Sequence, residues 1–197
     1  IQILKEDRSR DQAQKDHKGD YKDFLNQCNI KMLIREIAEQ DWPRVVQLLN
    51  RTNELNTTGS RYQLEELKKS YEVNKDKIFV CELADKFGNY GLIAETIIDT
   101  RTPDIWFIRD LTVSCSTMGR GVGSTLVLAI LQLAKQNGIK KVQGRLVENE
   151  SNWRMQSLYE KRGFTKIYDD GKTKRYEFNL SNEILGYPFW IGVAIKI

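Results

Sequence analysis

A short run of alternating glycines is the part of this sequence that most clearly indicates a binding site. Gly119, Gly121 and Gly123 directly precede an apolar stretch that starts near Ser124 and is expected to form a helix. Glycines let the backbone come close to a ligand and adopt positive φ angles. The amides then point outward at a helix N-terminus, where unpaired N–H groups and the helix dipole favour an anion. The run predicts a loop suited to a pyrophosphate; an ordinary turn is the alternative.

Two well-known phosphate loops do not fit this run. A P-loop places Lys and then Ser or Thr after its last glycine, and the loop here contains no Lys. The dinucleotide fingerprint Gly-x-Gly-x-x-Gly follows the first strand of a βαβ unit, whereas these glycines have a different spacing and follow a predicted hairpin. Kinase and ATPase chemistry is therefore not expected, although a nucleotide-binding or regulatory module remains an alternative.

Two motifs resemble those of the GNAT superfamily of acyltransferases. The loop is similar to the motif Arg/Gln-x-x-Gly-x-Gly/Ala, with matches at Gly121 and Gly123 and a departure at Met118. About 30 residues later, Asn152-Trp-Arg-Met-Gln-Ser-Leu-Tyr-Glu-Lys-Arg-Gly-Phe164 is similar to Asn-x-x-Ala-x-x-Leu-Tyr-x-x-x-Gly-Phe, with Met155 replacing the small residue. The resemblance implies an α/β (α+β) GNAT fold, with a mixed central sheet of about six to seven strands flanked by helices on both faces.

The same resemblance implies a cofactor and a role for each motif. The implied cofactor is CoA or acyl-CoA, or the 4′-phosphopantetheine arm of a carrier protein. Asn152 would orient the pantetheine arm, and the Tyr159 hydroxyl would protonate the departing thiolate. A phenol with an ordinary pKa near 10 suits that donation. The implied cofactor-binding residues are Leu111, Val113, Arg120, Gly121, Val122, Gly123, Ser124, Asn152 and Tyr159.

A base must also take a proton from the attacking amine, and in this superfamily it is often a carboxylate on a central strand. Glu95 and Asp110 are the candidates for this catalytic role, with Glu82 as a weaker third. Each has a structural alternative, because strand carboxylates usually face solvent. Tyr159 has the alternative of a core tyrosine on an amphipathic helix, and Asn152 that of a helix N-cap.

The elements that must position these residues follow from hydrophobic periodicity and turn residues. Asp41 is expected to cap a helix with Pro43 in its first turn, and residues 53–60 are expected only to end it. Residues 188–195 are apolar and predict a further strand or a strip packed on the sheet. The other predicted strands are 30–37, 78–83, 90–98, 105–113, 140–146, 164–168 and 175–179, and the other predicted helices are 62–71, 124–136 and 152–162.

Composition limits the kinds of site, the cellular location and the partners that we expect. The three cysteines are far apart and the single His17 lies in a charged stretch, so neither a disulfide framework nor a metal site is expected. No apolar run is long enough to span a membrane, and no signal peptide is evident, so a cytoplasmic location is expected. Residues 118–177 hold 12 Lys and Arg against 6 Asp and Glu, which suits a phosphate-bearing ligand or an acidic protein. No basic run is interleaved with aromatic residues, so nucleic acid is not expected.

Beyond the superfamily, the chain resembles the C-terminal domain of FkbH-like proteins of polyketide biosynthesis. The residues that carry this are Leu49-Asn-Arg-Thr-Asn-Glu-Leu-Asn-Thr-Thr-Gly-Ser-Arg-Tyr62 and Val113-Ser-Cys-Ser-Thr-Met-Gly-Arg-Gly-Val122. The resemblance implies an upstream HAD-type domain that loads a glyceryl unit onto an acyl carrier protein. No HAD signature is present in these 197 residues. We expect residues 1–29 to be a linker or charged helix and residues 30–197 to be the acyltransferase-like domain.

Three functions remain open from the sequence. The first is an active acyltransferase that uses acyl-CoA or an acyl carrier protein. The second is a catalytically degenerate GNAT fold that docks a carrier protein for an upstream domain. The third is the nucleotide-binding or regulatory module. The acyl group, the acceptor and the oligomeric state cannot be read from these residues.

Overall fold

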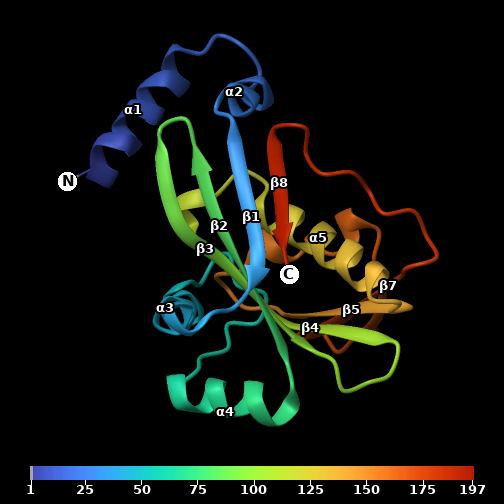
Figure 1. The fold of residues 1–197 in the computed structure, drawn as a ribbon. Helices are drawn as coiled ribbons and strands as arrows, with labels where there is room; N and C mark the ends of the chain where they lie inside the picture. The colour runs from blue at the N-terminus through green and yellow to red at the C-terminus, as the bar shows by residue number, and fades with distance from the viewer. Residues whose placement is uncertain (1) are drawn as a thin grey trace.

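An eight-stranded mixed sheet forms the centre of the molecule, and helices cover both of its faces (Figure 1). The computed structural model describes residues 2–197. The strands lie in the order β6-β7-β5-β4-β3-β2-β1-β8. The strands are β1 (Ile30–Glu36), β2 (Lys77–Asp85), β3 (Gly88–Asp99), β4 (Ile105–Val113), β5 (Lys141–Val147), β6 (Thr165–Asp169), β7 (Thr173–Asn179) and β8 (Ile191–Lys196). The α-helices are α1 (Gln2–Asp16), α2 (Tyr21–Gln27), α3 (Trp42–Arg51), α4 (Leu64–Asn74) and α5 (Val122–Gln136).

The predicted fold class is confirmed, with one strand more than the six to seven expected. The additional strand, β8, comes from the apolar segment whose pattern allowed either a strand or a packed strip. It pairs in parallel with β1, from Ile30 opposite Ile191 to Arg35 opposite Lys196. β1 to β4 form an antiparallel meander, and β4 then pairs in parallel with β5.

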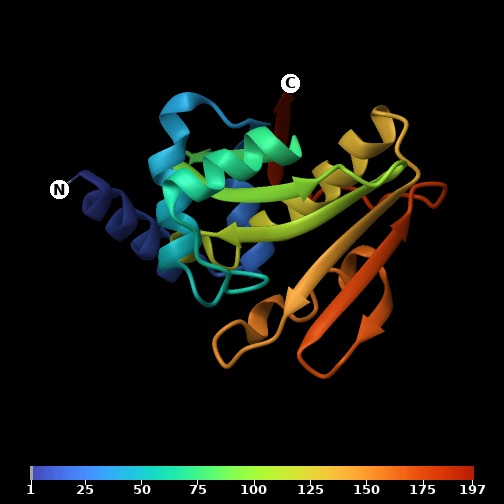
Figure 2. The ribbon, with the colours of Figure 1, turned by 90° about the horizontal axis from the view of Figure 1, so that it is seen from below.

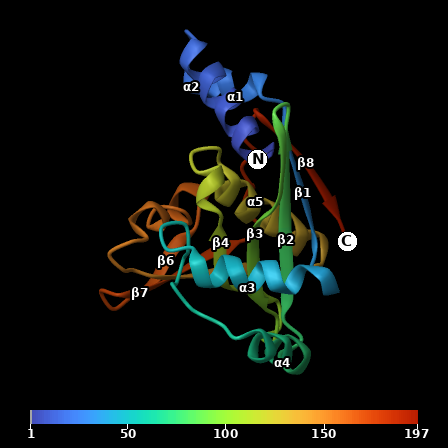
Figure 3. The same cartoon turned by 90° about the vertical axis from the view of Figure 1, so that its left-hand side faces the viewer.

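Two hydrophobic cores hold the helices against the sheet (Figure 3). On one face, α3 and α4 pack through Val45, Leu48, Leu49 and Leu67 onto strand residues such as Val80. Pro43 stands in the first turn of α3, as its pattern predicts. On the other face, the almost entirely apolar α5 packs against β4 and β5. Each helix therefore packs against the sheet through its own hydrophobic stripe.

β4 and β5 share only a short ladder and then separate. Their register runs from Ile105 opposite Lys141 to Ile108 opposite Gly144. Figure 2 shows β5 and β7 turning away from β3 and β4 beyond this ladder. A strand that leaves its neighbour exposes backbone groups that need other partners. The opening between the later parts of β4 and β5 is therefore the place where an additional extended segment can bind.

Two parts of the chain differ from simple expectations. The helix predicted over residues 152–162 is wrong: the segment forms two short 3-10 helices, η3 (Trp153–Met155) and η4 (Glu160–Arg162). Their i to i+3 bonds include Leu158 N to Met155 O at 3.0 Å, and this tighter winding turns Met155, Leu158 and Tyr159 all inward.

Residues 1–29 were expected to be a linker or a charged helix. Their described part contains α1 and α2, and Phe24 and Leu25 of α2 are buried in the main core.

Candidate active site

The glycine loop leads into the N-terminus of α5, as the sequence predicts. Gly119 and Gly121 have φ angles of +79° and +86°, a region that side-chain-bearing residues rarely adopt. The first backbone bond at this end of α5 runs from Thr125 N to Gly121 O at 2.9 Å. The amides of Val122, Gly123 and Ser124 precede that bond, so they are the helix's unpaired N-terminal donors. They give the loop the anion-binding character that a pyrophosphate requires.

A cavity of about 140 Å³ lies beside these amides. Its apolar wall is formed by Leu55, Val113, Met155 and Leu158. A Cβ placed on Gly123 would lie 3.4 Å from Val113 Cγ2 and 3.8 Å from Leu158 Cδ1. Gly123 therefore keeps the cavity open at the point where the loop faces its wall. We call this cavity and its glycine loop the mouth.

Of the two polar residues predicted in the loop, Ser124 lines the mouth and Arg120 does not. The Arg120 side chain is buried, lies over the ring of Tyr90 at 4.6 Å, and lines a different cavity together with Arg10. Its backbone is paired as well, since Arg120 N donates to Thr117 O and Trp190 Nε1 donates to Arg120 O at 2.9 Å. The Ser124 hydroxyl accepts a hydrogen bond from Arg162. That Arg120 and Ser124 bind the cofactor stays a prediction.

A segment of the chain fills the opening between β4 and β5. Leu55, Asn56 and Thr57, which we call the strap, run antiparallel to β4, with Asn56 opposite Thr112. Thr57 N donates to Leu111 O at 3.0 Å, and Val113 N donates to Leu55 O at 2.8 Å. Leu111 N donates to Thr57 Oγ1 at 3.0 Å, and on the other side Val147 N donates to Thr57 O at 2.8 Å. The strap therefore joins β4 to β5 like a short additional strand.

The Asn152 side chain also holds the strap. Its Nδ2 donates to Asn56 O at 3.0 Å and to Val147 O at 2.9 Å, while its Oδ1 accepts from Asn149 N at 3.0 Å. Asn152 is completely buried. The Asn152 amide thus binds the protein's own backbone around the strap and forms no side-chain cap on η3, so the alternative of a helix N-cap is wrong. Its role toward a pantetheine arm stays a prediction.

Tyr159 lies inside the core and directly follows Leu158 of the mouth's wall. Its ring stacks on Tyr176 at 5.4 Å and covers Gly144, where a Cβ would come within 2.3 Å of the ring. The hydroxyl is buried and forms no hydrogen bond with any described residue. Burial and, secondarily, the charge of Asp110 raise the pKa of this phenol. Tyr159 is thus a protonated hydroxyl without a partner, as a proton donor awaiting a substrate would be.

Asp110 is buried among four polar partners. The Tyr62 hydroxyl donates to its Oδ2 at 2.6 Å and Thr58 Oγ1 donates to its Oδ1. Arg109 and Arg145 approach its two oxygens at 3.7 and 3.8 Å. Thr58 and Tyr62 directly follow the strap in the chain. Asp110 therefore anchors the segment that carries the strap.

Glu95 is also fully buried, with a different environment. It lies opposite Thr112 on β4 and Val80 on β2, so it faces α3 and α4. Its carboxyl is beside the Thr112 hydroxyl, but no hydrogen bond of normal geometry reaches either oxygen from the described residues. Burial, with Asp110 nearby, raises the pKa of Glu95 to about 8. Glu82, the weaker candidate, forms an ion pair with Arg35 at 2.6 Å.

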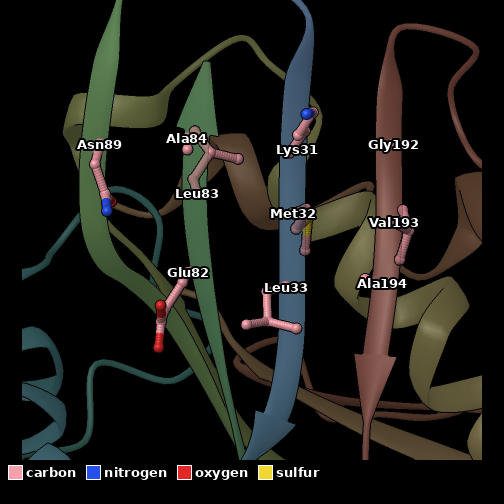
Figure 4. A pocket seen from close by; sticks show the side chains of 10 residues that line it. All are labelled: Lys31, Met32, Leu33, Glu82, Leu83, Ala84, Asn89, Gly192, Val193 and Ala194. Atoms are coloured by element: carbon pink, nitrogen blue, oxygen red, sulfur yellow. The ribbon is translucent and has the colours of Figure 1, made fainter. Parts of the chain in front are cut away.

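An open hollow of about 470 Å³ lies on a different part of the sheet (Figure 4). It is lined by residues of β1, β2, β3 and β8, among them Leu33, Ala84 and Val193, and of the predicted site residues only Glu82, the weaker base candidate, lies in its lining. Within residues 2–197, no group of three His, Cys, Asp or Glu side chains is placed to hold a metal ion. No helix in that same range is long and apolar enough to cross a membrane.

The sequence model of the acetyltransferase (GNAT) family matches residues 34–164, from β1 to the end of the Tyr159 segment. The chain belongs to this family. No curated protein matches the sequence. The GNAT family is one of acyl-transferring enzymes that use acetyl-CoA, and the match spans the glycine loop, both strand carboxylates and Tyr159.

Solved structures share the GNAT fold at low sequence identity. A domain from Methanocaldococcus jannaschii has a TM-score of 0.61 at 19% identity over 76% of this chain and 99% of that one. The ribosomal-protein-S18-alanine N-acetyltransferase of Escherichia coli has a TM-score of 0.59 at 15% identity, covering 77% and 96%. The spermidine N-acetyltransferase of Vibrio cholerae, solved with CoA and spermine, has a TM-score of 0.57 at 19% identity, covering 76% and 96%.

Sequence reasoning missed the strap of this GNAT domain. Residues 53–60 are rich in Asn, Thr and Gly, and this composition predicts only the end of a helix. The same small polar side chains also form the strap's contacts: Asn56 Oδ1 accepts from the backbone of Thr58 and Gly59 at 3.0 and 2.8 Å. A cluster of such residues between two helices is the signal that could have indicated an ordered, pairing loop.

Proposed function

We propose that this domain binds a pantetheine thioester at the mouth and transfers its acyl group to an amine or another nucleophile. The observation that carries this proposal is that three features adjoin. The unpaired α5 amides stand beside the apolar mouth, and Tyr159, with its buried and unpaired hydroxyl, directly follows Leu158 of the mouth's wall. A pyrophosphate followed by a thioester arm has the same order of charged, apolar and reactive parts.

Each of the chain's own groups has a task in this proposal. The amides of Val122, Gly123 and Ser124 hold the pyrophosphate. The Tyr159 hydroxyl gives its proton to the departing thiolate, and burial, which raises the pKa of this phenol, keeps it protonated before the reaction. Asp110 is the better candidate base. Burial raises the pKa of Glu95 to about 8, so a larger share of this carboxyl carries a proton at neutral pH than is ordinary for Glu.

The finer proposal is that the thioester belongs to an acyl carrier protein in polyketide-type biosynthesis. It rests on the resemblance to FkbH-like proteins and on the basic balance of residues 118–177. The rim of the mouth supports it: Trp153 is 58% exposed and Arg154 lies over its ring at 4.3 Å. Exposed aromatic and cationic side chains at a cofactor entrance suit an acidic protein partner.

A second candidate function is favoured by the strap. Because residues 55–57 fill the opening that leads to Tyr159, the domain would also serve as a GNAT fold that docks a carrier protein without transferring its acyl group. The two functions make different demands. A transferase must admit the arm past Leu55, whereas a docking domain needs only the rim and the mouth.

Binding and thiol release together separate the two candidates. We would titrate CoA and a carrier protein bearing 4′-phosphopantetheine by calorimetry, and then measure thiol release from acetyl-CoA and from acetyl-carrier protein. Spermine and an alanine-starting peptide are suitable first acceptors, since the structural neighbours from V. cholerae and E. coli are named for such groups. Acceptor-dependent thiol release supports the transferase, and carrier binding without release supports docking. Binding of neither probe would contradict both.

A further inference from the structure

The strap holds three of the groups that the sequence assigns to the thioester arm. Leu111 and Val113 were predicted to bind the cofactor, and their amides donate instead to Thr57 Oγ1 and Leu55 O at 3.0 and 2.8 Å. Asn152 was predicted to orient the arm, and its Nδ2 donates instead to Asn56 O at 3.0 Å. The three residues of the strap thus accept hydrogen bonds from two amides of β4 and from the Asn152 side chain, which follows β5 in the chain.

One buried hydroxyl next to the mouth has no partner. Tyr159 directly follows Leu158 of the mouth's wall, and its hydroxyl forms no hydrogen bond with any described residue. Buried unpaired hydroxyls are uncommon and each costs free energy. The cavity of about 140 Å³ stops at Leu55, the first residue of the strap. Open space therefore lies on one side of the strap, while the unpaired Tyr159 hydroxyl stays buried in the core.

We propose that the strap is an internal occupant of the thioester arm's site, so that strap and arm exclude each other. This inference rests on the proposed function. The strap withdraws from the opening when an arm binds, which frees the Leu111 and Val113 amides and the Asn152 side chain. The domain therefore keeps Tyr159 closed to solvent until an arm of sufficient length competes for the same donors.

The chain on both sides of the strap has anchors of its own. Arg61 donates to Leu49 O and to Thr52 O, which fixes the chain just before and after the strap to the end of α3. Thr58 and Tyr62 are bound to Asp110. These anchors do not involve β4 or β5 main-chain groups, so they can persist when Leu55 to Thr57 withdraw. With a paired and a withdrawn arrangement, this short segment would be the two-state element that population shift requires.

Loosening the strap is the first test. Thr57→Val keeps the side chain's shape and removes the acceptor of Leu111 N, so the closed arrangement loses one buried hydrogen bond. Apparent affinity is reduced by the fraction of molecules in the binding-competent state, so this variant is expected to bind CoA roughly tenfold more tightly. Thr96→Val is the matched control, since Thr96 is equally buried and donates to Asp110 O at 3.0 Å without touching the strap.

Locking the strap is the opposite test. Asn56 and Thr112 stand opposite each other, flanked by bonds from Thr57 N and Val113 N, which makes them a non-hydrogen-bonded antiparallel pair. Such a pair has a Cα separation of about 4.5 Å, close enough for a disulfide. The N56C/T112C protein, in a Cys115→Ser background to remove the exposed thiol, should lose roughly tenfold or more of its CoA affinity on oxidation and regain it with reductant.

Calorimetry with CoA and hydrogen exchange of the Leu111 and Val113 amides serve as readouts for all variants. Tighter binding by Thr57→Val, unchanged binding by Thr96→Val and redox-dependent binding by the double-cysteine protein would support the proposal. If wild type binds CoA and Thr57→Val binds equally or more weakly, the strap is structural and the inference is wrong while the proposed function stands. Absence of CoA binding in every variant would overturn both.

Discussion

The mouth and the closed opening are two parts of one proposed ligand path, and they are built in different ways. The glycine loop of the mouth is made of backbone amides and glycines that are close together in sequence, from Gly119 to Ser124. The opening is made of partners far apart in the chain: Thr57 binds Leu111, 54 residues away, and Asn152 binds Asn56, 96 residues away. Local chemistry therefore sets where an anion binds. Tertiary pairing sets whether a longer ligand can proceed to Tyr159.

The largest effect is expected at the inner end of the path. Tyr159→Phe keeps the ring on Tyr176 and removes the proton donor, so turnover should fall roughly 100-fold. Thermal stability should stay equal or rise, because the lost hydroxyl is buried and forms no hydrogen bond with a described residue. Tyr176→Phe is the control, since Tyr176 is buried in the same stack. Full activity in the Tyr159 variant with a lower melting temperature would show that Tyr159 is only a core residue.

The next effect is expected at the mouth. Gly123→Val would place a Cβ 3.4 Å from Val113 Cγ2 and direct branched methyl groups into the cavity wall. CoA affinity should fall tenfold or more, about 1.4 kcal/mol. Gly186→Val makes the same chemical change where a Cβ meets nothing within 4 Å, so it controls for the added bulk. Equal CoA affinity in a folded Gly123 variant would exclude the mouth as the phosphate site. The proposed ligand path would then have no site for the pyrophosphate.

Sequence patterns predicted the strand, the glycine loop and the helix of the mouth well because their signal is local. The alternating glycines, the strand before them and the apolar helix after them all lie within one continuous stretch, and each is found where expected. The strap and the 3-10 helices were not predicted, since both depend on contacts with distant strands. Glu95 shows the same limit. Its strand pattern allows an exposed position, but β3 lies inside the sheet and α3 covers that face, so burial is complete.

The buried carboxyl of Glu95 should make the free energy of unfolding depend on pH. The pKa of Glu95 in the folded protein, about 8, is above its ordinary value of 4.5. The unfolded chain therefore loses this proton first, and stability falls as pH rises from about 4.5 to 8, by at most roughly 1.4 kcal/mol per pH unit. Glu95→Gln removes this dependence, so the variant should gain on the wild type between pH 5 and 9. Urea unfolding at pH 5, 7 and 9 measures the difference, and parallel curves would contradict a buried neutral Glu95.

The smallest effect is expected at the rim of the mouth, where the partner rather than the arm is recognised. Arg154 pairs with Glu54 at 3.3 Å and lines the mouth, and Lys161 is exposed nearby in the chain. Exposed charges act mainly on association rate and are screened within about 8–10 Å at physiological salt. Changing Arg154 and Lys161 to Glu should slow association of the 4′-phosphopantetheine-bearing carrier protein several-fold at low salt.

The matched control for this change reverses two exposed charges, Lys69→Glu in α4 and Lys75→Glu at its C-cap, on the opposite face of the sheet from α5. Stopped-flow association at low and physiological ionic strength compares the two double variants. CoA is itself an anion, so changing Arg154 and Lys161 to Glu should also weaken CoA binding. The informative quantity is the ratio of the effect on carrier-protein association to the effect on CoA association. A larger effect on the carrier protein means that the rim contacts protein surface. Equal effects would mean that these cations interact only with the phosphates at the mouth. Acyl-CoA, rather than an acyl carrier protein, would then be the better candidate for the thioester.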